Sequence, residues 1–300
     1  MIDEHEWRSV LQVAEDGTFS LAAKHLFISQ PSLSQCIKKI EGELGMQIFD
    51  RSQSPLQLTE AGRIYIEAAH KMKKLRQDLL RQVDDLSELR SGQVRIGSSR
   101  TRSVCILADA IASFHQRYPN IRITLVEGST ARLREHVQQG HVDFALLYEP
   151  LPASTFNTIP LMEERVFMAV PPHHQLAKKY GPQQPLPYPS ISFTAFRDEP
   201  FIALKPNRRM TDIFARLCRE TGCHPKVIFE SDSILSAAEF CSKGMGSTLV
   251  TDMVIERGFR GESPFFFNLE EAVETRQLVA AYGQNQHLSK AAQVFLQFIH

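Results

Sequence analysis

The sequence predicts an α+β multidomain protein, with helices at its N-terminus and mixed strands and helices in the remainder. Three observations predict this fold class. Residues 17–44 have the pattern of two short helices joined by a tight turn, residues 59–90 repeat apolar residues at helical spacing, and strands alternate with helices after Ser91-Gly92. With 300 residues and 43% hydrophobic content, the chain can bury more than one core, so we expect two or three domains.

Residues 17–44 predict a helix-turn-helix. Small and apolar residues suit a short first helix that packs on its neighbours: Leu21, Ala22, Ala23 and Leu26. Thr18 and Ser20 can cap this helix, and residues 27–29 form the turn. Ser29 can cap the second helix, and Pro31 falls in its first turn, where a missing N–H does no harm. The second helix is expected to bury one face, made of Leu33, Cys36, Ile37, Ile40 and Leu44.

The other face of this second helix carries polar side chains that are suited to DNA. They are Gln30, Ser32, Ser34, Gln35, Lys38 and Lys39. Glutamine can pair with adenine in the major groove, serine is adaptable, and lysine suits phosphate contact. Between Asp16 and Glu41 there is no carboxylate, against three lysines and one histidine, so this stretch is a basic island in an acidic segment. The alternative is an ordinary helical hairpin whose polar face meets water.

Residues 59–90 predict one long helix with Thr59 as its cap. Its apolar residues step by fours and threes, as in a coiled-coil seam: Ile64, Ala68, Met72, Leu75, Leu79, Val83 and Leu86. At about 1.5 Å per residue the helix spans roughly 45 Å. Because its own chain offers little surface to cover such a rod, we expect a second copy of the chain to cover the seam. The alternative is a helix packed against the C-terminal region of its own chain.

Strands and helices alternate from residue 92 onward, which is typical of α/β folding. The expected strands are 94–97, 121–127, 143–148, 166–170, 201–204, 226–230, 247–251 and 276–282. The expected helices are 104–118, 131–139, 211–221, 233–242 and 289–299.

In open α/β sheets, ligands bind beyond the carboxyl ends of the strands and near helix N-termini. This rule selects Ser98, Ser99, Arg100, Thr101, Arg102, Ser129, Thr130, Tyr148, Leu204 and Lys205. The turn before the strand 247–251 adds Met245, Ser247 and Thr248. Because hydroxyls, helix N–H groups and arginines bind anions, we expect a small anionic metabolite, a carboxylate above all, with no metal and no other cofactor. Alternatively, Ser99 or Thr101 caps a helix and both arginines face solvent, which requires no ligand.

Composition narrows the class of protein. Lys and Arg (34) balance Asp and Glu (34), and a net charge of zero argues against a protein that coats nucleic acid indiscriminately. No run approaches a membrane-spanning length, and the charged start Met1–Arg8 lacks the apolar core of a signal peptide. Five cysteines without compact spacing fit reduced thiols, so we expect a cytoplasmic protein.

The N-terminal residues resemble the LysR-type transcriptional regulators. The matching residues are Ala14, Gly17-Thr18-Phe19-Ser20, Ala22-Ala23, Leu26, Ser29-Gln30-Pro31-Ser32, Ser34, Ile37, Leu44-Gly45, Phe49-Asp50-Arg51 and Leu58-Thr59-Glu60-Ala61-Gly62. Agreement over about sixty residues is far more specific than an isolated motif. The resemblance implies a winged helix-turn-helix over 1–58, a long linker and dimerisation helix over 59–90, and a two-lobed α/β effector domain over 91–300 that resembles periplasmic binding proteins.

The resemblance also implies residue roles and partners. Gln30, Pro31, Ser32 and Gln35 would face bases, and Arg51 in the wing would reach phosphate or the minor groove; an ion pair between Arg51 and Asp50 is the alternative. Lobe I would comprise 91–163 and 268–300, and lobe II 164–267, with the effector between them and crossings near residues 163 and 267. The assembly would be a homodimer through the linker helix, usually a homotetramer, on double-stranded operator DNA. Cys36 and Gly42 are unusual choices in the second helix.

Other functions fit the sequence less well. Peroxide-sensing members of this family use a cysteine pair in the second lobe, which makes thiol-based redox sensing through Cys218 and Cys223 the alternative function. The reactive cysteine expected upstream is absent, however, and a packing role suits Cys218 better. Zinc would need a second ligand pair near Cys223-His224. The sequence contains no nucleophile elbow, Walker loop or dinucleotide-binding glycine motif, so we expect no enzyme.

Overall fold

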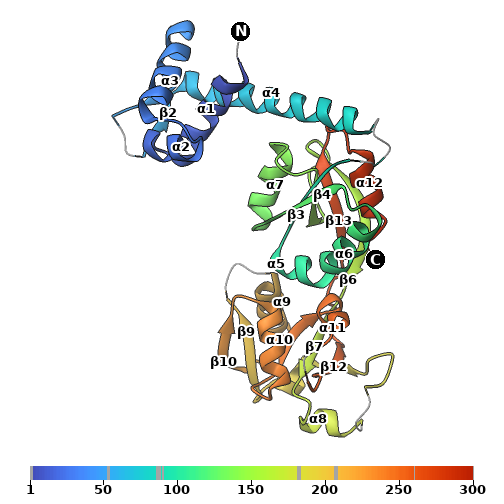
Figure 1. Cartoon of the computed structure of the whole chain (residues 1–300). Coiled ribbons are helices and arrows are strands. Elements are labelled where there is room, and N and C mark those ends of the chain that lie inside the picture. Colours follow the sequence, from blue (N-terminus) through green and yellow to red (C-terminus); the bar gives the residue numbers. More distant parts are fainter. Residues whose placement is uncertain are drawn as a thin grey trace. The chain divides into compact units, whose positions relative to one another are not determined.

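The computed structural model describes residues 3–52, 55–85, 89, 91–180, 184–205, 209–259 and 261–299. It contains two compact units, Met1–Val83 and Asp84–His300, and each is described by itself (Figure 1). No described helix combines the length and the apolarity that crossing a membrane requires.

The first unit holds three short helices, a two-stranded hairpin and a long helix. They are α1 (Glu4–Asp16), α2 (Phe19–His25), α3 (Gln30–Leu44), β1 (Phe49–Asp50), β2 (Gln57–Leu58) and α4 (Glu60–Asp85). The residues that cap α2, α3 and α4 are those that the sequence predicts. The hydroxyl oxygens of Thr18, Ser29 and Thr59 each accept a backbone N–H three residues further along the chain, at 3.3, 3.3 and 3.0 Å. These caps fix where α2, α3 and α4 begin.

The helix-turn-helix packs around one apolar core. Its buried members are Trp7, Val10, Val13, Ala22, Ala23, Leu33, Ile37, Ile40, Ile48 and Phe49, with Tyr65 and Ala69 from α4. Two residues that the sequence assigns to buried faces lie outside this core, since Leu21 and Leu44 are 42% and 45% exposed. Leu44 is the last residue of α3, directly before Gly45, whose φ of 68° ends the helix, so it extends beyond the turn that Ile40 anchors.

The long helix α4 divides its apolar residues between two faces. Tyr65 and Ala69 are buried in the core of the first unit, and Met72, which the sequence places in the seam, packs partly beside them. The other described seam residues are mostly open, since Ile64, Leu75, Leu79 and Val83 are 54–72% exposed. Leu86 lies outside the described residues. An apolar stripe of α4 is therefore available to a partner.

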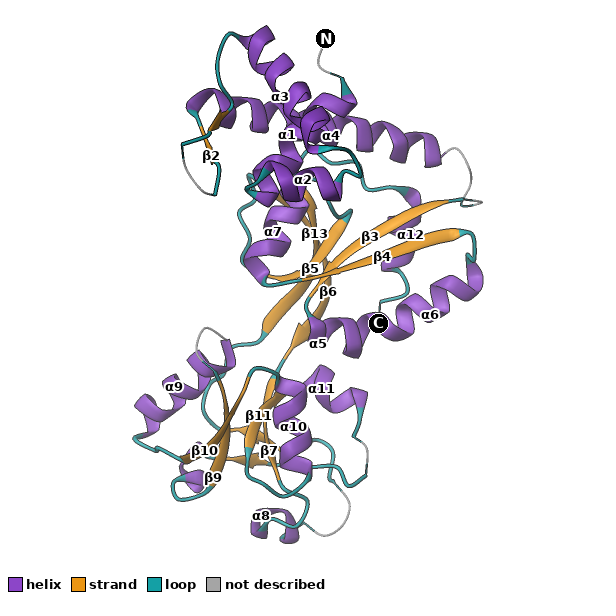
Figure 2. Ribbon diagram, turned by 60° about the vertical axis from the view of Figure 1, so that its left-hand side comes forward, coloured by secondary structure: helices purple, strands orange, loops and turns teal. Residues whose placement is uncertain are grey.

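Lobe I of the second unit is a five-stranded sheet in the order β4-β3-β5-β13-β6 (Figure 2). Its strands are β3 (Gly92–Ser98), β4 (Ile121–Glu127), β5 (Phe144–Tyr148), β6 (Phe156–Glu164) and β13 (Arg276–Gly283). The first three are parallel, and β13 runs antiparallel to β5 and β6. Helices α6 (Ala108–Arg117) and α12 (Lys290–Leu296) pack on one face around Phe114 and Phe295, whereas α7 (Thr130–Gln138) covers the other face through Leu133 and Val137.

Lobe II contains a four-stranded sheet in the order β11-β7-β12-β8 and a parallel pair, β9 and β10. Its strands are β7 (Val166–Val170), β8 (Ser190–Ile191), β9 (Pro200–Leu204), β10 (Lys226–Ser231), β11 (Thr248–Thr251) and β12 (Phe265–Leu269). Its helices are α8 (Gln175–Lys178), a 3₁₀ turn (Phe193–Phe196), α9 (Arg209–Thr221), α10 (Ile234–Ser242) and α11 (Asp252–Arg257). A bridge between Phe201 and Ser247 joins the pair to the sheet.

The chain crosses between the lobes twice. The first crossing, at Arg165 between β6 and β7, lies next to the predicted position. The second lies in residues 270–275, a few residues beyond the predicted position, because Phe267 and Asn268 still pair with β7 in the lobe II sheet. Neither β6 nor β12 was among the expected strands. A shifted register around Pro160 hides the alternation of β6, and β12 begins with three consecutive phenylalanines, which do not alternate with polar residues.

One predicted helix begins earlier than expected. The sequence predicts it over 104–118, but the helix starts at Arg100 as α5 (Arg100–Arg102) and passes through a π-helical turn (Ser103–Leu107) into α6. Ser99 caps this start, because its hydroxyl oxygen accepts the Arg102 N–H at 3.4 Å. The early start places Arg102 in the first helical turn and not in a loop.

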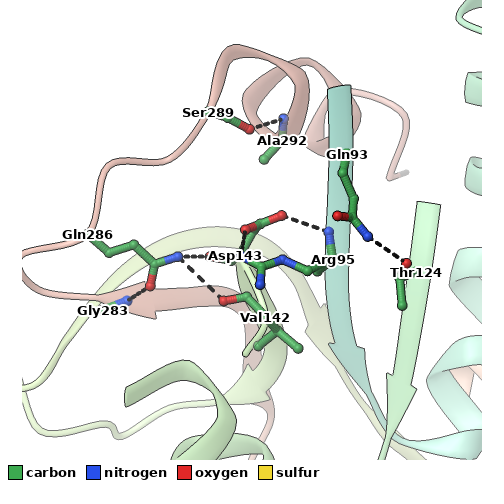
Figure 3. A network of polar contacts seen from close by, with 9 residues as sticks. All are labelled: Gln93, Arg95, Thr124, Val142, Asp143, Gly283, Gln286, Ser289 and Ala292. Atoms are coloured by element: carbon green, nitrogen blue, oxygen red, sulfur yellow. Dashed lines mark hydrogen bonds and ion pairs between the residues drawn. The ribbon is translucent and has the colours of Figure 1, made fainter. Parts of the chain in front are cut away.

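A buried polar network fixes the start of β5 (Figure 3). The Asp143 carboxylate, which is 2% exposed, accepts the backbone N–H of Arg95 at 2.7 Å and its guanidinium at 2.9 Å. The Gln286 amide donates to the carbonyl oxygen of Asp143 at 2.9 Å. Asp143 precedes β5 and Tyr148 ends it, so this network holds the strand whose carboxyl end carries Tyr148.

Candidate functional site

The outward face of α3 presents the polar residues that the sequence predicts. Gln30, Pro31, Ser32, Gln35, Lys38 and Lys39 are exposed, and Ser34 is half-buried. They surround the N-terminal turns of a helix whose opposite side is anchored by Leu33, Ile37 and Ile40. In a helix-turn-helix this is the part that meets base edges in the major groove.

Two of the predicted phosphate contacts are ion-paired within the protein. The Lys39 ammonium lies 2.8 Å from the Glu6 carboxylate of α1, and the Arg51 guanidinium lies 2.7 Å from the Glu41 carboxylate. Arg51 does not pair with Asp50, which instead accepts hydrogen bonds from Ser52. Asp50 is not the partner of Arg51 because its carboxylate already accepts hydrogen bonds from Ser52 within its own turn.

Lys38 differs from Lys39. It is exposed, and no ion pair joins it to any residue in the described ranges. Lys38 can therefore reach a phosphate without first giving up a carboxylate, whereas Lys39 and Arg51 must exchange one anion for another.

The Lys39–Glu6 pair predicts a pH dependence of the first unit. The hydrogen bond from Lys39, followed by the Asp3 backbone N–H, lowers the pKa of Glu6 from its usual value of 4.5. A lowered pKa stabilises the fold fully above the ordinary pKa, and this contribution is lost as the pH falls through the folded value. We therefore expect acid to lower the melting temperature of wild type more than that of Glu6→Gln below about pH 5.

The fluorescence of Trp7 provides the measurement, because it is the only tryptophan of the chain and is 7% exposed in the core of the first unit. Glu15→Gln, an exposed change on the same helix, serves as the control and should follow wild type. Parallel acid profiles of wild type and Glu6→Gln would contradict the assignment.

A cavity of about 420 Å³ lies in the second unit between residues of the two lobes. Lobe I and the crossing strands contribute Ser99, Thr101, Arg102, Ser129, Thr130, Ala131, Tyr148, Glu164 and Arg276. Lobe II contributes Leu204, Arg209, Met210, Asp232, Ile234, Thr251 and Met253. Tyr148, Leu204 and Thr251 are the last residues of β5, β9 and β11, so the cavity lies at the carboxyl ends of strands from both lobes.

Charged side chains meet in the lining of this cavity. The Glu164 carboxylate, 3% exposed, lies 2.6 Å from the Arg276 guanidinium and accepts the Tyr148 hydroxyl at 2.8 Å. The Arg276 and Arg102 guanidinium groups lie 3.7 and 5.0 Å from the centre of the Tyr148 ring. Burial, and then the negative charge of Glu164, raise the pKa of Tyr148, so its hydroxyl stays protonated as a donor.

Arg102 is the unbalanced member of this cluster. Its side chain belongs to a residue that is 5% exposed, and its Nε has no hydrogen-bond partner within the described structure. No carboxylate of the described residues pairs with it, since Glu164 pairs with Arg276. Burial lowers the pKa of Arg102 because desolvation disfavours the cation, and Tyr148 and Glu164 offset this effect only in part. A buried cation without a counter-ion is costly, and an anion beside it would offset that cost.

The structure brings seven of the predicted effector residues to this cavity. They are Ser99, Thr101, Arg102, Ser129, Thr130, Tyr148 and Leu204. Ser99 and Ser129 also cap helices, as the alternative interpretation predicts for Ser99. Arg100 and Arg102, both predicted effector residues, differ in exposure. The Arg100 side chain is 87% exposed and lies 4.0 Å from Glu127, whereas Arg102 is buried, so the alternative with both arginines in solvent does not hold for Arg102.

Other predicted effector residues lie elsewhere. Ser98 is buried at the end of β3, and Lys205 is an exposed residue that pairs with Asp232 at 2.9 Å. Met245, Ser247 and Thr248 do not line the cavity. They lie where β11 begins, and Ser247 bridges to Phe201 at the N-terminal end of β9, whereas the cavity meets the far ends of these strands.

The rule that ligands bind at the carboxyl ends of strands itself points to Thr251 and Met253. Thr251 ends β11, Met253 follows it, and both line the cavity. Thr251 Oγ1 is also buried without a partner in the described structure. The same rule points to Asp232, which directly follows β10. Glu164, Arg209 and Arg276 carry no comparable signal in the sequence. Glu164 and Arg276 meet through the pairing of β6 with β13, across more than a hundred intervening residues.

The structure gives Cys218 and Cys223 the surroundings of packing residues. Both are buried in the lobe II core, and burial raises the pKa of each thiol. Because the thiolate is the species that reacts with oxidants, raised pKa values oppose thiol sensing. Among the described residues, no group of three or more His, Cys, Asp or Glu side chains could hold a metal ion.

Comparison with known proteins connects both sites to one family. Residues 5–63 match the model of the bacterial regulatory helix-turn-helix protein, lysR family, and residues 87–300 match the LysR substrate binding domain. The chain is 31% identical over 295 residues to the HTH-type transcriptional regulator YcgK of Bacillus subtilis, covering 95% of this chain and 90% of that protein.

Solved structures share the fold along the whole chain. A full-length OxyR variant from Pseudomonas aeruginosa matches with a TM-score of 0.69 at 19% identity, covering 100% of this chain and 98% of that one. Full-length CbnR in complex with its target DNA matches with a TM-score of 0.62 at 17% identity, covering 99% and 98%. These likenesses show the fold: a winged helix-turn-helix, a long helix and a two-lobed α/β domain.

Proposed function

Because the chain belongs to the LysR family of transcriptional regulators, we propose that it reads double-stranded operator DNA through α3 under the control of a small anionic metabolite. The metabolite binds in the cavity between the lobes. The observation that carries this proposal is Arg102, a buried cation that lines the cavity and has no carboxylate partner in the described part of the chain. The protein is a non-enzymatic regulator that acts in the cytoplasm.

DNA binding follows from the outward face of α3. Gln30 and Gln35 can pair with adenine, Ser32 is adaptable, and Lys38 is free to contact phosphate. Arg51 lies in the loop after β1, the wing, where it can exchange Glu41 for a phosphate or enter the minor groove. The match of a DNA-bound CbnR structure supports this use of the fold.

Control follows from the place of the effector cavity. Its lining contains Glu164, which ends β6, and Arg276, which begins β13. These two strands border the crossings between the lobes. An anion that interacts with this cluster changes the forces at both crossings, and any difference in its affinity for two lobe arrangements shifts the population between them. The DNA-binding heads of an oligomer are then spaced differently on the operator.

Assembly follows from the open apolar stripe of α4. We expect a homodimer through α4, and a homotetramer as the usual form in this family. Placing two charges in the stripe, Leu75→Glu with Leu79→Glu, should weaken dimerisation by about tenfold or more, since buried seam charges would be unpaired.

Sedimentation at micromolar concentration measures this effect. Leu186→Glu is the control, because Leu186 is 78% exposed in the second unit and lies outside α4. A doubly charged variant that sediments like wild type would show that another surface holds the dimer.

The experiment that tests the proposed function is thermal stabilisation of the full chain by a panel of small carboxylates, each paired with its neutral amide. A ligand at 100 times its dissociation constant adds about 2.7 kcal/mol to the stability of the state that binds it. We expect a saturable rise with a selected acid and none with its amide. No rise with any anion, together with a shift on oxidation, would favour the thiol-sensing alternative.

A further inference from the structure

The charges that line the cavity do not balance. Three arginines, Arg102, Arg209 and Arg276, face two carboxylates, Glu164 and Asp232. Both carboxylates are already paired, Glu164 with Arg276 at 2.6 Å and Asp232 with Lys205 at 2.9 Å. Within the described residues, the cavity is therefore left with two arginines that form no ion pair with a carboxylate.

The two unmatched arginines belong to different lobes. Arg102 stands in the helix that follows β3 of lobe I, and Arg209 is the first residue of α9 in lobe II. Arg209 donates one hydrogen bond, from Nη2 to the carbonyl oxygen of Glu274, at a long 3.3 Å. Burial, and then the positive charge of Arg276, lower the pKa of Arg209, so an anion beside it would be stabilised.

The backbone adds to this positive potential. Helices α7, α9 and α10, each of nine or more residues, begin at the cavity with Thr130, Arg209 and Ile234. The lining also has an apolar part made of Met210, Ile234 and Met253, all in lobe II. The cavity thus offers two cationic positions, on opposite lobes, with an apolar surface in lobe II.

We infer that the effector is a dianion, such as a dicarboxylate, that binds Arg102 of lobe I with one anionic group and Arg209 of lobe II with the other. This inference rests on the proposed function and names the class of its ligand. Arg276 is not the second contact, because Glu164 already neutralises it. A dianion of this kind joins the two lobes, whereas a monoanion satisfies Arg102 and leaves Arg209 unmatched.

The test compares straight-chain α,ω-dicarboxylates with monocarboxylates of the same carbon number, by calorimetric titration of the full chain at constant ionic strength. We expect at least one dicarboxylate to bind about tenfold or more tightly than its matched monocarboxylate, as charge-assisted hydrogen bonds to a second arginine require. Arg209→Gln should lower the affinity of that dicarboxylate to the level of the monocarboxylate. Arg219→Gln, an exposed change on the same helix, should leave both affinities unchanged.

The outcomes separate this inference from the proposed function. One outcome is that matched monocarboxylates and dicarboxylates bind equally, that both bind more weakly to Arg102→Gln, and that neither is affected by Arg209→Gln. This outcome would overturn the dianion inference and leave the proposal of an anionic effector intact. If neither series binds, or Arg102→Gln changes nothing, both are wrong. Circular-dichroism melting of each variant shows whether the second unit remains folded.

Discussion

Replacing Arg102 by glutamine is expected to abolish the response to the effector while DNA binding stays intact. Arg102 is buried at the cavity, unpaired by any described carboxylate, and lies in the second unit, whereas the DNA-reading residues belong to the first. Losing a charge-assisted hydrogen bond to an anion in a desolvated site costs about 2–3 kcal/mol or more, which is roughly a hundredfold in affinity. The free protein should not lose stability, because the change also removes an uncompensated buried charge.

Arg100→Gln is the matched control for this prediction. Arg100 lies two residues away on the same helical turn, but its side chain is 87% exposed and it does not line the cavity. Effector affinity is measured by calorimetry and operator affinity by gel shift for both variants. If Arg100→Gln abolishes the response and Arg102→Gln does not, the assignment of the anion to this cavity is wrong.

Replacing Gln30 by alanine is expected to weaken discrimination between DNA sequences more than it weakens general DNA binding. Gln30 is exposed and begins α3, where side chains reach base edges. A lost bidentate contact with a base costs about 1–3 kcal/mol on the preferred sequence and little on random DNA. The ratio of specific to non-specific affinity, measured at one fixed salt concentration, should therefore fall by about tenfold.

Two further variants serve as controls for the ratio of specific to non-specific affinity. Lys38→Ala should weaken binding to both kinds of DNA alike and reduce the dependence of the logarithm of affinity on the logarithm of salt concentration by about one unit. Gln47→Ala, an exposed glutamine outside α3, should change neither. An equal loss on specific and random DNA in Gln30→Ala would remove Gln30 from base recognition.

The sequence predicts the elements whose pattern is local. The strands β4 and β7 have the predicted bounds, and Thr18, Ser29 and Thr59 cap the predicted helices. Strand β6 is not predicted because a register shift at Pro160 breaks the alternation of its buried and exposed residues. Periodicity identifies an element only where one face is consistently buried.

The candidate effector site is predictable only in part, because some of its residues have a local sequence signal and others do not. Ser99 directly follows β3, Tyr148 ends β5 and Thr130 begins the helix after β4, so the carboxyl-end rule finds them. Glu164, Arg209 and Arg276 come together only through the tertiary fold, which no local pattern encodes. Nor does the sequence distinguish Arg100 from Arg102. The helix exposes Arg100 and buries Arg102, but it begins earlier than its apolar periodicity indicates.

We propose that anion binding in the cavity is coupled to DNA binding by α3. The most direct test is to measure effector affinity twice, for the free protein and for the protein bound to an operator selected from random DNA. Coupling is reciprocal, so the factor by which DNA changes effector affinity must equal the factor by which effector changes DNA affinity. We expect equal factors of about 5–150-fold, lost in Arg102→Gln. Identical effector affinities with and without DNA, together with an unchanged DNA footprint, would contradict the claim.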